Sequence, residues 1–590
     1  MTIAPPAETA TAAAAVDESA TPTAPASLPP TPRSGLDAAV AAVAAQRAAW
    51  AAAAIGDRIR LLDRLTRDFL AVAPRWAAAA AKAEGLEPDS PGAGEEWLTG
   101  PYLVIRNLRL LREALEDVDE TGAPESPGAV TTRPDGRVVA EVFPASLYDR
   151  LFFPGVGAEV WMEPGVTVEG LAETQAVAYR KGSPGAVALV LGAGNVSSIG
   201  PMDVLYKLFV EHQVVVLKAH PVNAYLGPLL EEGFAALIER DLLRVVYGGA
   251  EEGAYLCDHP DVDTIHVTGS DRTYEAIVFG TGEDGRRRKA EGRPRIAKPV
   301  TAELGNVSPV IVVPGPWSAR DLAYQAENLA AMLVNNAGFN CNAARVIVQH
   351  AGWDRREALL DAIREVLARV PPRKAYYPGA AERFDELTAA HPETERFGRR
   401  GDGRLPWALI PGLDPRSETE PLYRFEAFNS LFAETALEAA SPAEFVDRAV
   451  EFANDRLWGT LSATLIVDSA ALRDAATRDA VERAIAGLRY GTVTLNHWAG
   501  VGYGLVVTPW GAYPGHPPHD IQSGTGVVHN SLMFSRPEKT VVRSPFRAFP
   551  KPPWFPSHRA DRTLAEALTR FEASPSPFRL PGVFWPALRG

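Results

Sequence analysis

The sequence predicts an α/β protein built on a doubly wound parallel sheet, together with a second α/β domain and a small β element. Residues 186–191 and 213–218 are almost continuously apolar, which is typical of parallel strands buried on both faces. A helical pattern lies between them, and a third strand is expected within residues 262–270. Strands that alternate with helices predict a Rossmann-like nucleotide-binding sheet, whose ligand crevice lies at the carboxyl ends of its strands.

Composition limits the kinds of partner. With 590 residues, 46% of them hydrophobic, the chain can bury a large core and should form more than one domain. A net charge of −14 argues against nucleic acid or an anionic membrane as the main partner. No run of about 18 apolar residues suggests a membrane span. Two cysteines are too few for a disulfide framework, which favours a cytoplasmic location.

The expected elements divide the chain into five segments. Residues 1–35 are rich in Ala, Pro and Thr without aromatics, and predict a disordered tail. Residues 36–300 should form the nucleotide-binding domain, beginning with two amphipathic helices and including a strand hairpin near 135–165. A second domain covers 301–490. Residues 491–547 return to the first domain and contain a predicted strand at 538–544. Residues 548–590 form a Pro/aromatic extension, expected to be an ordered arm with a short helix at 564–571.

One cysteine lies in a polar, glycine-bearing turn. Cys341 stands between Asn340 and Asn342, shortly after Gly338, and a β-branched strand follows. Small residues allow the backbone to approach a ligand while its amides remain free to donate hydrogen bonds. A lone cysteine in such a turn is a candidate nucleophile, although it could also be a small buried hydrophobe.

An acidic residue upstream has an unusual setting. Glu303 lies between apolar neighbours, just before Gly305 and the hydrophobic strand at 310–313. A carboxylate is a poor core residue unless it has a partner or a chemical task.

Together these motifs resemble the aldehyde dehydrogenase superfamily. The resemblance rests on Glu303-Leu304-Gly305, a following Ser-Pro pair with a β-branched run, and Asn-x-Gly-x-x-Cys ending at Cys341. Further matching stretches at 452–461 and 491–496 follow in the same order as in the family. The resemblance therefore covers about residues 36–546. It implies that 301–490 is the catalytic domain, that Cys341 is the nucleophile and that Glu303 is the general base. The implied reaction is oxidation of an aldehyde to a carboxylic acid through a thiohemiacetal and a thioester, with no metal.

The resemblance also implies NAD or NADP as cofactor and assigns residues to it. Asn195 is expected to complete the oxyanion hole with the backbone amide of Cys341. The expected cofactor contacts are with the adenosine ribose, the pyrophosphate, the nicotinamide ribose and the nicotinamide ring. Lys218 is expected to contact the adenosine ribose, and Gly269 and Ser270 the pyrophosphate. Glu426 is expected to contact the nicotinamide ribose, and Phe428 the nicotinamide ring.

Three departures leave alternatives open. Pro221 stands where NAD-preferring members carry an acid after Lys218, so NADP is not excluded. Tyr274 replaces the second glycine of the phosphate turn, which leaves a non-catalytic NAD-binding or structural protein as an alternative. His220-Pro221 and Gly305-Asn306 resemble CoA-acylating relatives, whereas Glu303 is typical of the hydrolytic branch. We favour a member of the hydrolytic branch, with a CoA-acylating aldehyde dehydrogenase or acyl-CoA reductase as the alternative.

Assembly follows from the same resemblance. Superfamily members associate by exchanging strands, and residues 538–544 are the candidate strand. A homodimer or homotetramer is therefore expected.

Overall fold

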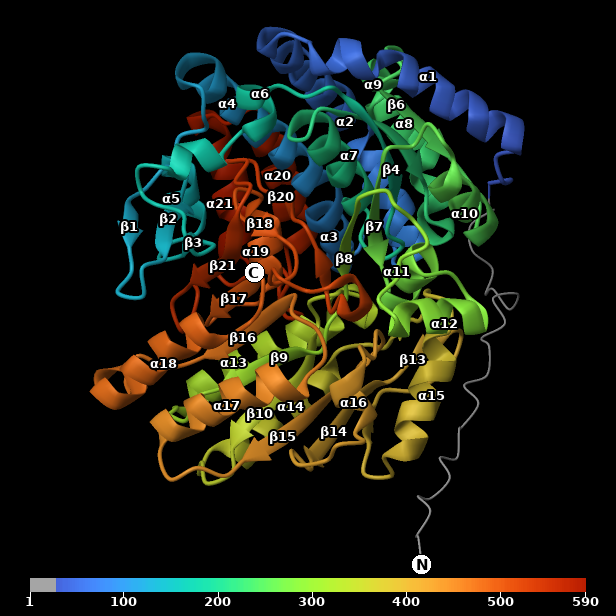
Figure 1. Cartoon of the computed structure of the whole chain (residues 1–590). Coiled ribbons are helices and arrows are strands. Elements are labelled where there is room, and N and C mark those ends of the chain that lie inside the picture. Colours follow the sequence, from blue (N-terminus) through green and yellow to red (C-terminus); the bar gives the residue numbers. More distant parts are fainter. Residues whose placement is uncertain (1–27) are drawn as a thin grey trace, which may run out of the picture.

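The computed structural model describes residues 28–590. Figure 1 shows two sheets, one in each half of the molecule, with helices packed around both. The smaller sheet has the strand order β19-β8-β7-β4-β5-β6, and every neighbouring pair except β19·β8 is parallel. Its strands are β4 (Ala186–Leu191), β5 (Gln213–Lys218), β6 (Leu243–Val246), β7 (Thr264–Gly269), β8 (Val300–Leu304) and β19 (Gly524–Thr525). The predicted α/β fold class is confirmed.

The strand order places a crevice at the centre of this sheet. From β4 the chain proceeds to β5 and β6 on one side, and later adds β7 and β8 on the other. At such a reversal the two connecting segments leave in opposite directions, which opens a ligand crevice beyond the carboxyl ends of the strands. Asn195, Lys218, Gly269 and Glu303 all lie at or just after those ends.

Helices cover the sheet and shorten the predicted tail. The covering helices are α1 (Arg33–Ala51), α2 (Ile55–Ala83), α4 (Leu103–Thr121), α7 (Ile199–Phe209) and α10 (Ala250–Asp258). Helix α1 already begins at Arg33, so the predicted boundary of the tail at residue 35 is too far along the chain. Its residues 1–27 lie outside the described part of the chain.

The larger sheet has eleven strands in the order β1-β2-β3-β21-β17-β16-β9-β10-β15-β14-β12. Helices α13 (Ala319–Val334), α14 (Arg356–Arg369), α17 (Pro442–Arg456) and α18 (Ala475–Gly487) accompany it. Its strands are β1 (Val130–Thr132), β2 (Val138–Phe143), β3 (Gly157–Met162), β9 (Ser308–Val312), β10 (Ala344–His350), β12 (Glu395–Phe397), β14 (Trp407–Leu413), β15 (Leu431–Leu437), β16 (Ser462–Ile466), β17 (Thr492–Leu495) and β21 (Pro537–Arg543).

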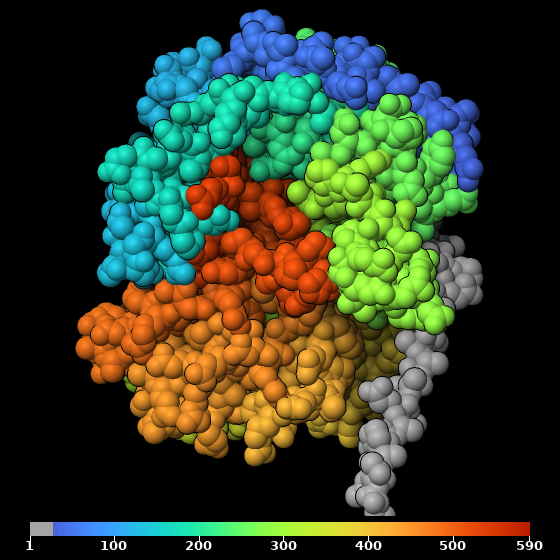
Figure 2. All heavy atoms as spheres, in the orientation of Figure 1, coloured from blue at the N-terminus to red at the C-terminus, as the bar shows by residue number. Residues whose placement is uncertain are grey.

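Strand β21 is the segment expected to pair with a second copy. Here both of its edges are used within one chain, because Thr540 pairs with Thr492 of β17 on one side and with Val160 of β3 on the other. The sheet is therefore continuous without a partner. On the face in Figure 2, orange-red residues of the last part of the chain fill the space between the cyan and green regions.

The C-terminal extension is helical and firmly attached. It contains α20 (Asp561–Ala573) and α21 (Leu580–Leu588), and α20 packs on α4 and on α3 (Gly94–Trp97). Arg106 donates to Glu572 at 2.6 Å and to Asp149 at 3.2 Å, all three being buried. Breaking a buried ion pair costs about 3–5 kcal/mol, so this network holds α20 strongly in place. None of the helices in residues 28–590 is long and apolar enough to cross a membrane.

Candidate active site

The turn that carries Cys341 has a strained backbone. Helix α13 ends at Val334, and Asn336 and Ala337 then adopt left-handed conformations with φ of 51° and 52°. Such conformations cost about 1–3 kcal/mol for residues other than glycine and persist only where the surroundings enforce them. Gly338 is required, since a Cβ atom there would lie 2.2 Å from the carbonyl oxygen of Asn429.

Hydrogen bonds from other elements hold this turn. The backbone amide of Asn336 donates to Glu95 at 2.6 Å, and the side chain of Asn335 donates to the same carboxylate at 3.1 Å. The side-chain amide of Asn336 donates to the carbonyl oxygen of Asn195 at 2.8 Å, and Tyr376 donates to Asn336 Oδ1 at 2.6 Å. Sequence reasoning missed Glu95 and Tyr376, because neither belongs to a motif.

Asn195 lies directly beside the nucleophile turn. Its side-chain nitrogen donates to the carbonyl oxygen of Phe339 at 2.8 Å, two residues before Cys341. An amide nitrogen carries two hydrogens, so a second one remains for a ligand. A side-chain donor next to the nucleophile turn is a candidate for hydrogen bonding to an oxyanion on Cys341.

The thiol of Cys341 and the carboxyl group of Glu303 are in contact. Burial raises the pKa of Cys341 well above its usual range, and the nearby carboxylates of Glu303 and Glu426 add to this. Burial also raises the pKa of Glu303 to about 7, helped by the charge of Asp203, while contact with the thiol opposes the shift. The thiol is therefore protonated at neutral pH, and a base that is partly ionised at that pH lies next to it.

Glu303 is held on β8 by a close backbone approach. Gly524 of β19 pairs with Glu303 and has φ of 120°. A Cβ atom at Gly524 would lie 1.9 Å from the carbonyl oxygen of Ala302, so only glycine fits there. The Oε1 atom of Glu303 is buried and has no hydrogen-bond partner in the protein, which leaves it available to a thiol, a water molecule or a substrate.

Glu426 is the second acid near the thiol. Burial raises its pKa to about 8, although Arg345 and Arg383 lower it in part. Its Oε2 atom lies against Gly305, where a Cβ atom would approach it to 1.7 Å. Its Oε1 atom is buried without a hydrogen-bond partner and lies 3.9 Å from the guanidinium group of Arg345. A buried acceptor without a hydrogen-bond partner in this crevice fits a ligand hydroxyl such as that of a ribose. The buried Arg345 was missed by sequence reasoning, although a basic residue at the start of a buried strand was a usable signal.

Aromatic rings border the same crevice. Phe428 packs on Phe339 with ring centroids 5.5 Å apart, and Tyr377 packs on Phe428 at 4.9 Å. The ring of His220 stacks on Tyr377 at 5.8 Å and covers the glycine turn after β4, because a Cβ atom at Gly194 would lie 2.3 Å from His220 Nδ1. Gly194 is thus needed for a histidine ring, which the sequence pattern did not predict.

The other expected cofactor residues lie further along the strand ends. Lys218 ends β5 and its side chain packs against Gly253, with a Cβ atom there 3.7 Å from Lys218 Cδ. Gly269 and Ser270 are exposed at the end of β7, and Ser270 Oγ accepts from the amide of Thr273 at 3.2 Å as the N-cap of α11 (Asp271–Val278). Free amides at a helix N-terminus suit a phosphate.

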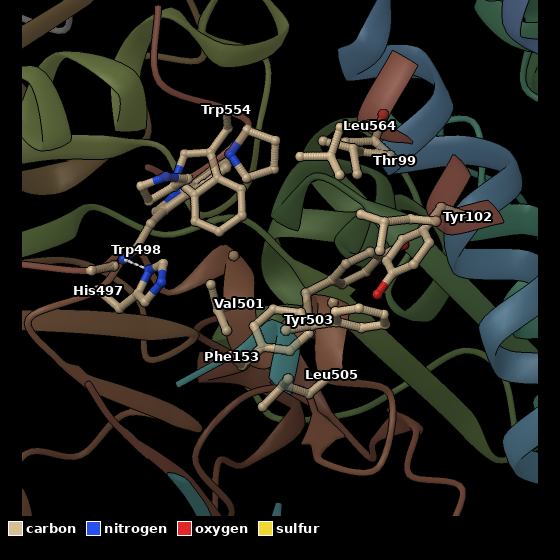
Figure 3. A pocket seen from close by; sticks show the side chains of 18 of the residues that line it. Thr99, Tyr102, Phe153, His497, Trp498, Val501, Tyr503, Leu505, Trp554 and Leu564 are labelled. Carbon is tan, nitrogen blue, oxygen red and sulfur yellow. Dashed lines mark hydrogen bonds between the residues drawn. The ribbon is translucent and has the colours of Figure 1, made fainter. Parts of the chain in front are cut away.

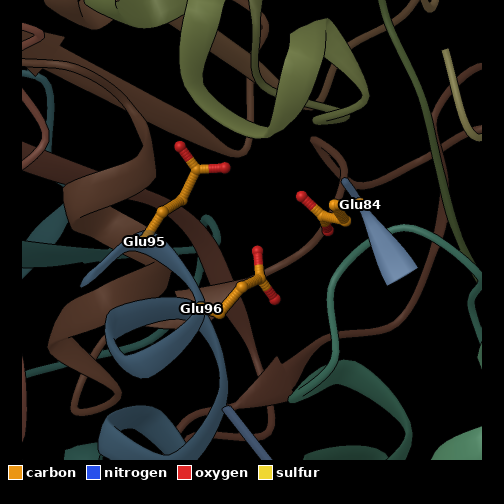
Figure 4. Close-up of side chains that lie close together, drawn as sticks. All are labelled: Glu84, Glu95 and Glu96. Carbon is orange, nitrogen blue, oxygen red and sulfur yellow. The ribbon is translucent and has the colours of Figure 1, made fainter. Parts of the chain in front are cut away.

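A buried acidic group lies behind the nucleophile turn. Figure 4 shows the side chains of Glu84, Glu95 and Glu96 close together. One carboxylate oxygen of each lies within 4.8 Å of those of the other two. Arg373 donates to Glu84 at 3.1 Å and to Glu95 at 3.4 Å, which supplies the compensating charge. Burial raises the pKa of Glu96 to about 7. Arg373 supplies one positive charge, and burial raises the pKa values of Glu84 and Glu96, so the group is an ion-pair network that supports Glu95.

A pocket opens from Cys341 on its other side. Figure 3 shows the apolar and aromatic side chains that line it, among them Phe153, Val501, Leu505, Trp554 and Leu564. The pocket is built from six parts of the chain: residues 95–103, 151–156, 196–199, 335–342, 497–505 and 548–587.

Comparisons with known proteins agree with this geometry. Residues 168–376 match the model of the Aldehyde dehydrogenase family. The chain is 28% identical to the aminoacetaldehyde dehydrogenase of Pseudomonas aeruginosa, over 45% of this chain and 49% of that protein. It is 34% identical to the human 4-trimethylaminobutyraldehyde dehydrogenase, over 24% of this chain and 26% of that protein. The matches thus span about half or less of these relatives.

Solved structures agree over most of the chain. An NAD-dependent aldehyde dehydrogenase from Sinorhizobium meliloti superposes with a TM-score of 0.58 at 18% identity, covering 88% of this chain and 89% of that one. An NADP-dependent glyceraldehyde-3-phosphate dehydrogenase from Bacillus halodurans, complexed with NADP, superposes with a TM-score of 0.58 at 17% identity. The superposition covers 87% of this chain and 92% of that one. The fold is therefore that of the aldehyde dehydrogenases. With the family match, this confirms the resemblance to the aldehyde dehydrogenase superfamily.

Proposed function

We propose that the chain is an aldehyde dehydrogenase that oxidises an aldehyde to a carboxylic acid with NAD or NADP. The observation that carries this proposal is the buried contact between the Cys341 thiol and the Glu303 carboxyl group, at a turn bordered by the side-chain amide of Asn195. A nucleophile, its base and an oxyanion donor are the three groups that acyl chemistry at a thiol needs.

In the proposed mechanism Glu303 accepts the thiol proton, and the thiolate of Cys341 attacks the aldehyde carbon. The resulting oxyanion accepts hydrogen bonds from the side chain of Asn195 and the backbone amide of Cys341. NAD or NADP, when bound, supplies the acceptor for the hydride that leaves the thiohemiacetal carbon. Glu303 releases the thiol proton to solvent and then removes a proton from water, which attacks the thioester. As the acid leaves, Cys341 regains a proton from Glu303.

The crevice offers groups that fit a dinucleotide. We assign the adenosine ribose to Lys218, the pyrophosphate to Gly269 and Ser270, the nicotinamide ribose to Glu426, and the nicotinamide side to Phe428. Support comes from the Oε1 atom of Glu426, which accepts no hydrogen bond within the protein, and from the exposed N-terminus of α11. Several similar structures are described as complexes with NAD+ or NADP.

CoA acylation is the alternative, and the position of His220 supports it. His220, part of the His-Pro pair that resembles CoA-acylating relatives, packs on the glycine turn and so belongs to the crevice itself. The contact between Glu303 and the thiol favours water as acceptor, because water needs a base far more than a thiol does. A panel of aldehydes assayed with NAD and with NADP, each with and without CoA, tests both. Absence of reduced cofactor with every aldehyde would leave only a non-catalytic NAD-binding or structural role.

For assembly we propose a homodimer or homotetramer formed by exchange of β21. The pairing of β21 with β17 within one chain can form equally between two copies, and domain swapping is a low-cost route to dimers. We also propose a reducing, cytoplasmic setting, where the free Cys341 and Cys257 would stay reduced.

A further inference from the structure

We propose that the substrate is an uncharged aldehyde with an extended hydrocarbon chain, and that the C-terminal segment 549–587 forms the wall that selects it. This inference rests on the proposed aldehyde oxidation at Cys341. It adds the class of substrate, which the motifs of the sequence do not specify.

The nucleophile turn gives the pocket a polar end. Cys341, Asn340 and Asn342 mark the reactive end, where a carbonyl group would lie. Away from it the lining is mainly aliphatic and aromatic, and comes from segments far apart in the sequence (Figure 3). The apolar side chains of this part are Leu98, Leu103, Leu151, Phe152, Phe153, Val156, Ile199, Val501, Leu505, Trp554, Leu564, Leu568, Val583 and Phe584.

The two charged residues in the lining, Glu95 and Lys551, lie at the nucleophile turn and at the rim, respectively. The carboxylate of Glu95 accepts from Asn335 and Asn336 and is close to Arg373, so its charge is already compensated. Lys551 donates to Ser557 at 2.9 Å at the exposed rim. Burial lowers the pKa of His497 to about 4, so this ring is neutral at physiological pH. A carboxylate or ammonium group placed against the apolar lining would lose its hydration without gaining a partner.

The outer wall is fixed in place by the fold. The ring of Trp554 packs on His497 at 5.1 Å and on Trp498 at 6.4 Å, and Trp498 donates to the carbonyl oxygen of Asn342 at 2.9 Å. The next part of the wall, α20, is held by the buried pair of Arg106 and Glu572. The wall is therefore connected directly to the residue that follows the nucleophile.

The rim of the pocket is also apolar. Phe549 and Leu151 line the pocket and are 73% and 41% exposed, respectively. Large exposed apolar side chains at the mouth of a cavity favour ligands that carry apolar surface out of water.

A chain-length series tests the inference. We expect kcat/KM to rise about fourfold for each methylene from propanal to octanal, the ratio that burial of one methylene gives. Aminoacetaldehyde and succinic semialdehyde should react at least tenfold less well than uncharged aldehydes of similar length. Turnover of aldehydes with no gain along the series, or with a preference for the charged ones, would overturn this inference and leave the proposed oxidation standing. No turnover of any aldehyde would remove the proposed oxidation, and this inference with it.

A pair of substitutions on α21 tests the role of the C-terminal segment. Ala587 lines the pocket, whereas its neighbour Leu588 does not line it and is 59% exposed. Ala587→Trp should lower the ratio of kcat/KM for octanal to that for propanal at least tenfold, because the new ring fills the outer part of the pocket. Leu588→Trp is the matched control and should keep the wild-type ratio.

Trp554→Ala provides a second, independent change in the wall. It removes the largest ring that the segment contributes to the pocket lining, so space opens near His497. The preferred chain length should therefore shift upward by at least one methylene. Thermal unfolding of each variant identifies those that fold. Unchanged chain-length ratios in folded Ala587→Trp and Trp554→Ala would exclude the segment as the selecting wall.

Discussion

The carboxylate of Glu95, on the short helix α3, accepts the backbone amide hydrogen of Asn336 at 2.6 Å, five residues before the nucleophile. Asn336 has a left-handed backbone that would relax without such support. The N-terminal helical region thus helps to set the position of Cys341, although it contributes no group to the chemistry.

Removing this carboxylate should affect turnover more than cofactor affinity. We expect Glu95→Ala to lower kcat roughly tenfold or more and the free energy of unfolding by about 2 kcal/mol, since bonds between a charged group and the turn are lost. Steady-state kinetics, a denaturant melt and a titration with NAD would measure this. Glu87→Ala, an exposed acid nearby, is the control. An unchanged kcat in Glu95→Ala would show that the turn needs no such support.

The covalent role of Cys341 predicts a selective loss. Cys341→Ala should reduce aldehyde oxidation to below roughly a thousandth of wild type while NADH still binds, because the thiol forms the intermediate and does little for the dinucleotide. Quenching of protein fluorescence by NADH measures binding separately from turnover. Cys257→Ala is the matched control, since Cys257 is buried away from the site. Substantial turnover in Cys341→Ala would refute the nucleophile assignment.

A substitution at Glu303 distinguishes transfer of the acyl group to water from its transfer to CoA. Glu303→Gln keeps the shape of the side chain but cannot accept a proton, so we expect slowed formation of one equivalent of reduced cofactor followed by arrest at the thioester. Stopped-flow traces with and without CoA decide between the acceptors. Turnover restored by CoA would place the chain in the acylating branch, whereas full hydrolysis without CoA would exclude Glu303 from the mechanism.

The pH dependence follows from the raised pKa of Glu303. Its value of about 7 means that the base is protonated below neutral pH, so kcat/KM should rise with pH through about 7. Asp203 raises this pKa, and Asp203→Asn should therefore move the rise to lower pH while keeping an oxygen for the hydroxyl of Thr268. A purely structural role of Asp203 would lower the rate without moving the profile.

The assembly state is measurable directly. Light scattering should give two or four times the chain mass of 63.3 kDa at micromolar concentration. Swapping of β21 predicts that cysteines placed at the paired positions Thr492 and Thr540 join two chains in a Cys341→Ser, Cys257→Ser background. A cross-link confined to single chains would instead show that β21 stays with its own sheet, as described here.

Local patterns were sufficient for the fold and for part of the site. Apolar runs such as 213–218 predict buried parallel strands because their periodicity is a property of neighbouring residues. Cys341 and Glu303 could be singled out because each has an unusual local setting. The support given by Glu95, Tyr376 and Asp203 could not be predicted, since it depends on contacts between segments far apart in the chain. The ring of His220 over Gly194 shows the same limit, because a glycine pattern does not reveal which group needs the space.

The reactive groups and the outer wall of the pocket come from different parts of the chain, and this affects how the range of substrates can change. Cys341, Glu303 and Asn195 come from the two central sheets, whereas much of the outer wall comes from the last forty or so residues, which contribute nothing to acid–base chemistry. Mutations in that segment that keep the contact of Trp554 with Trp498 can therefore change which aldehyde is oxidised while Cys341, Glu303 and Asn195 stay in place. Directed evolution of this chain towards new aldehydes should concentrate its libraries on 549–587, where variation is least constrained by catalysis.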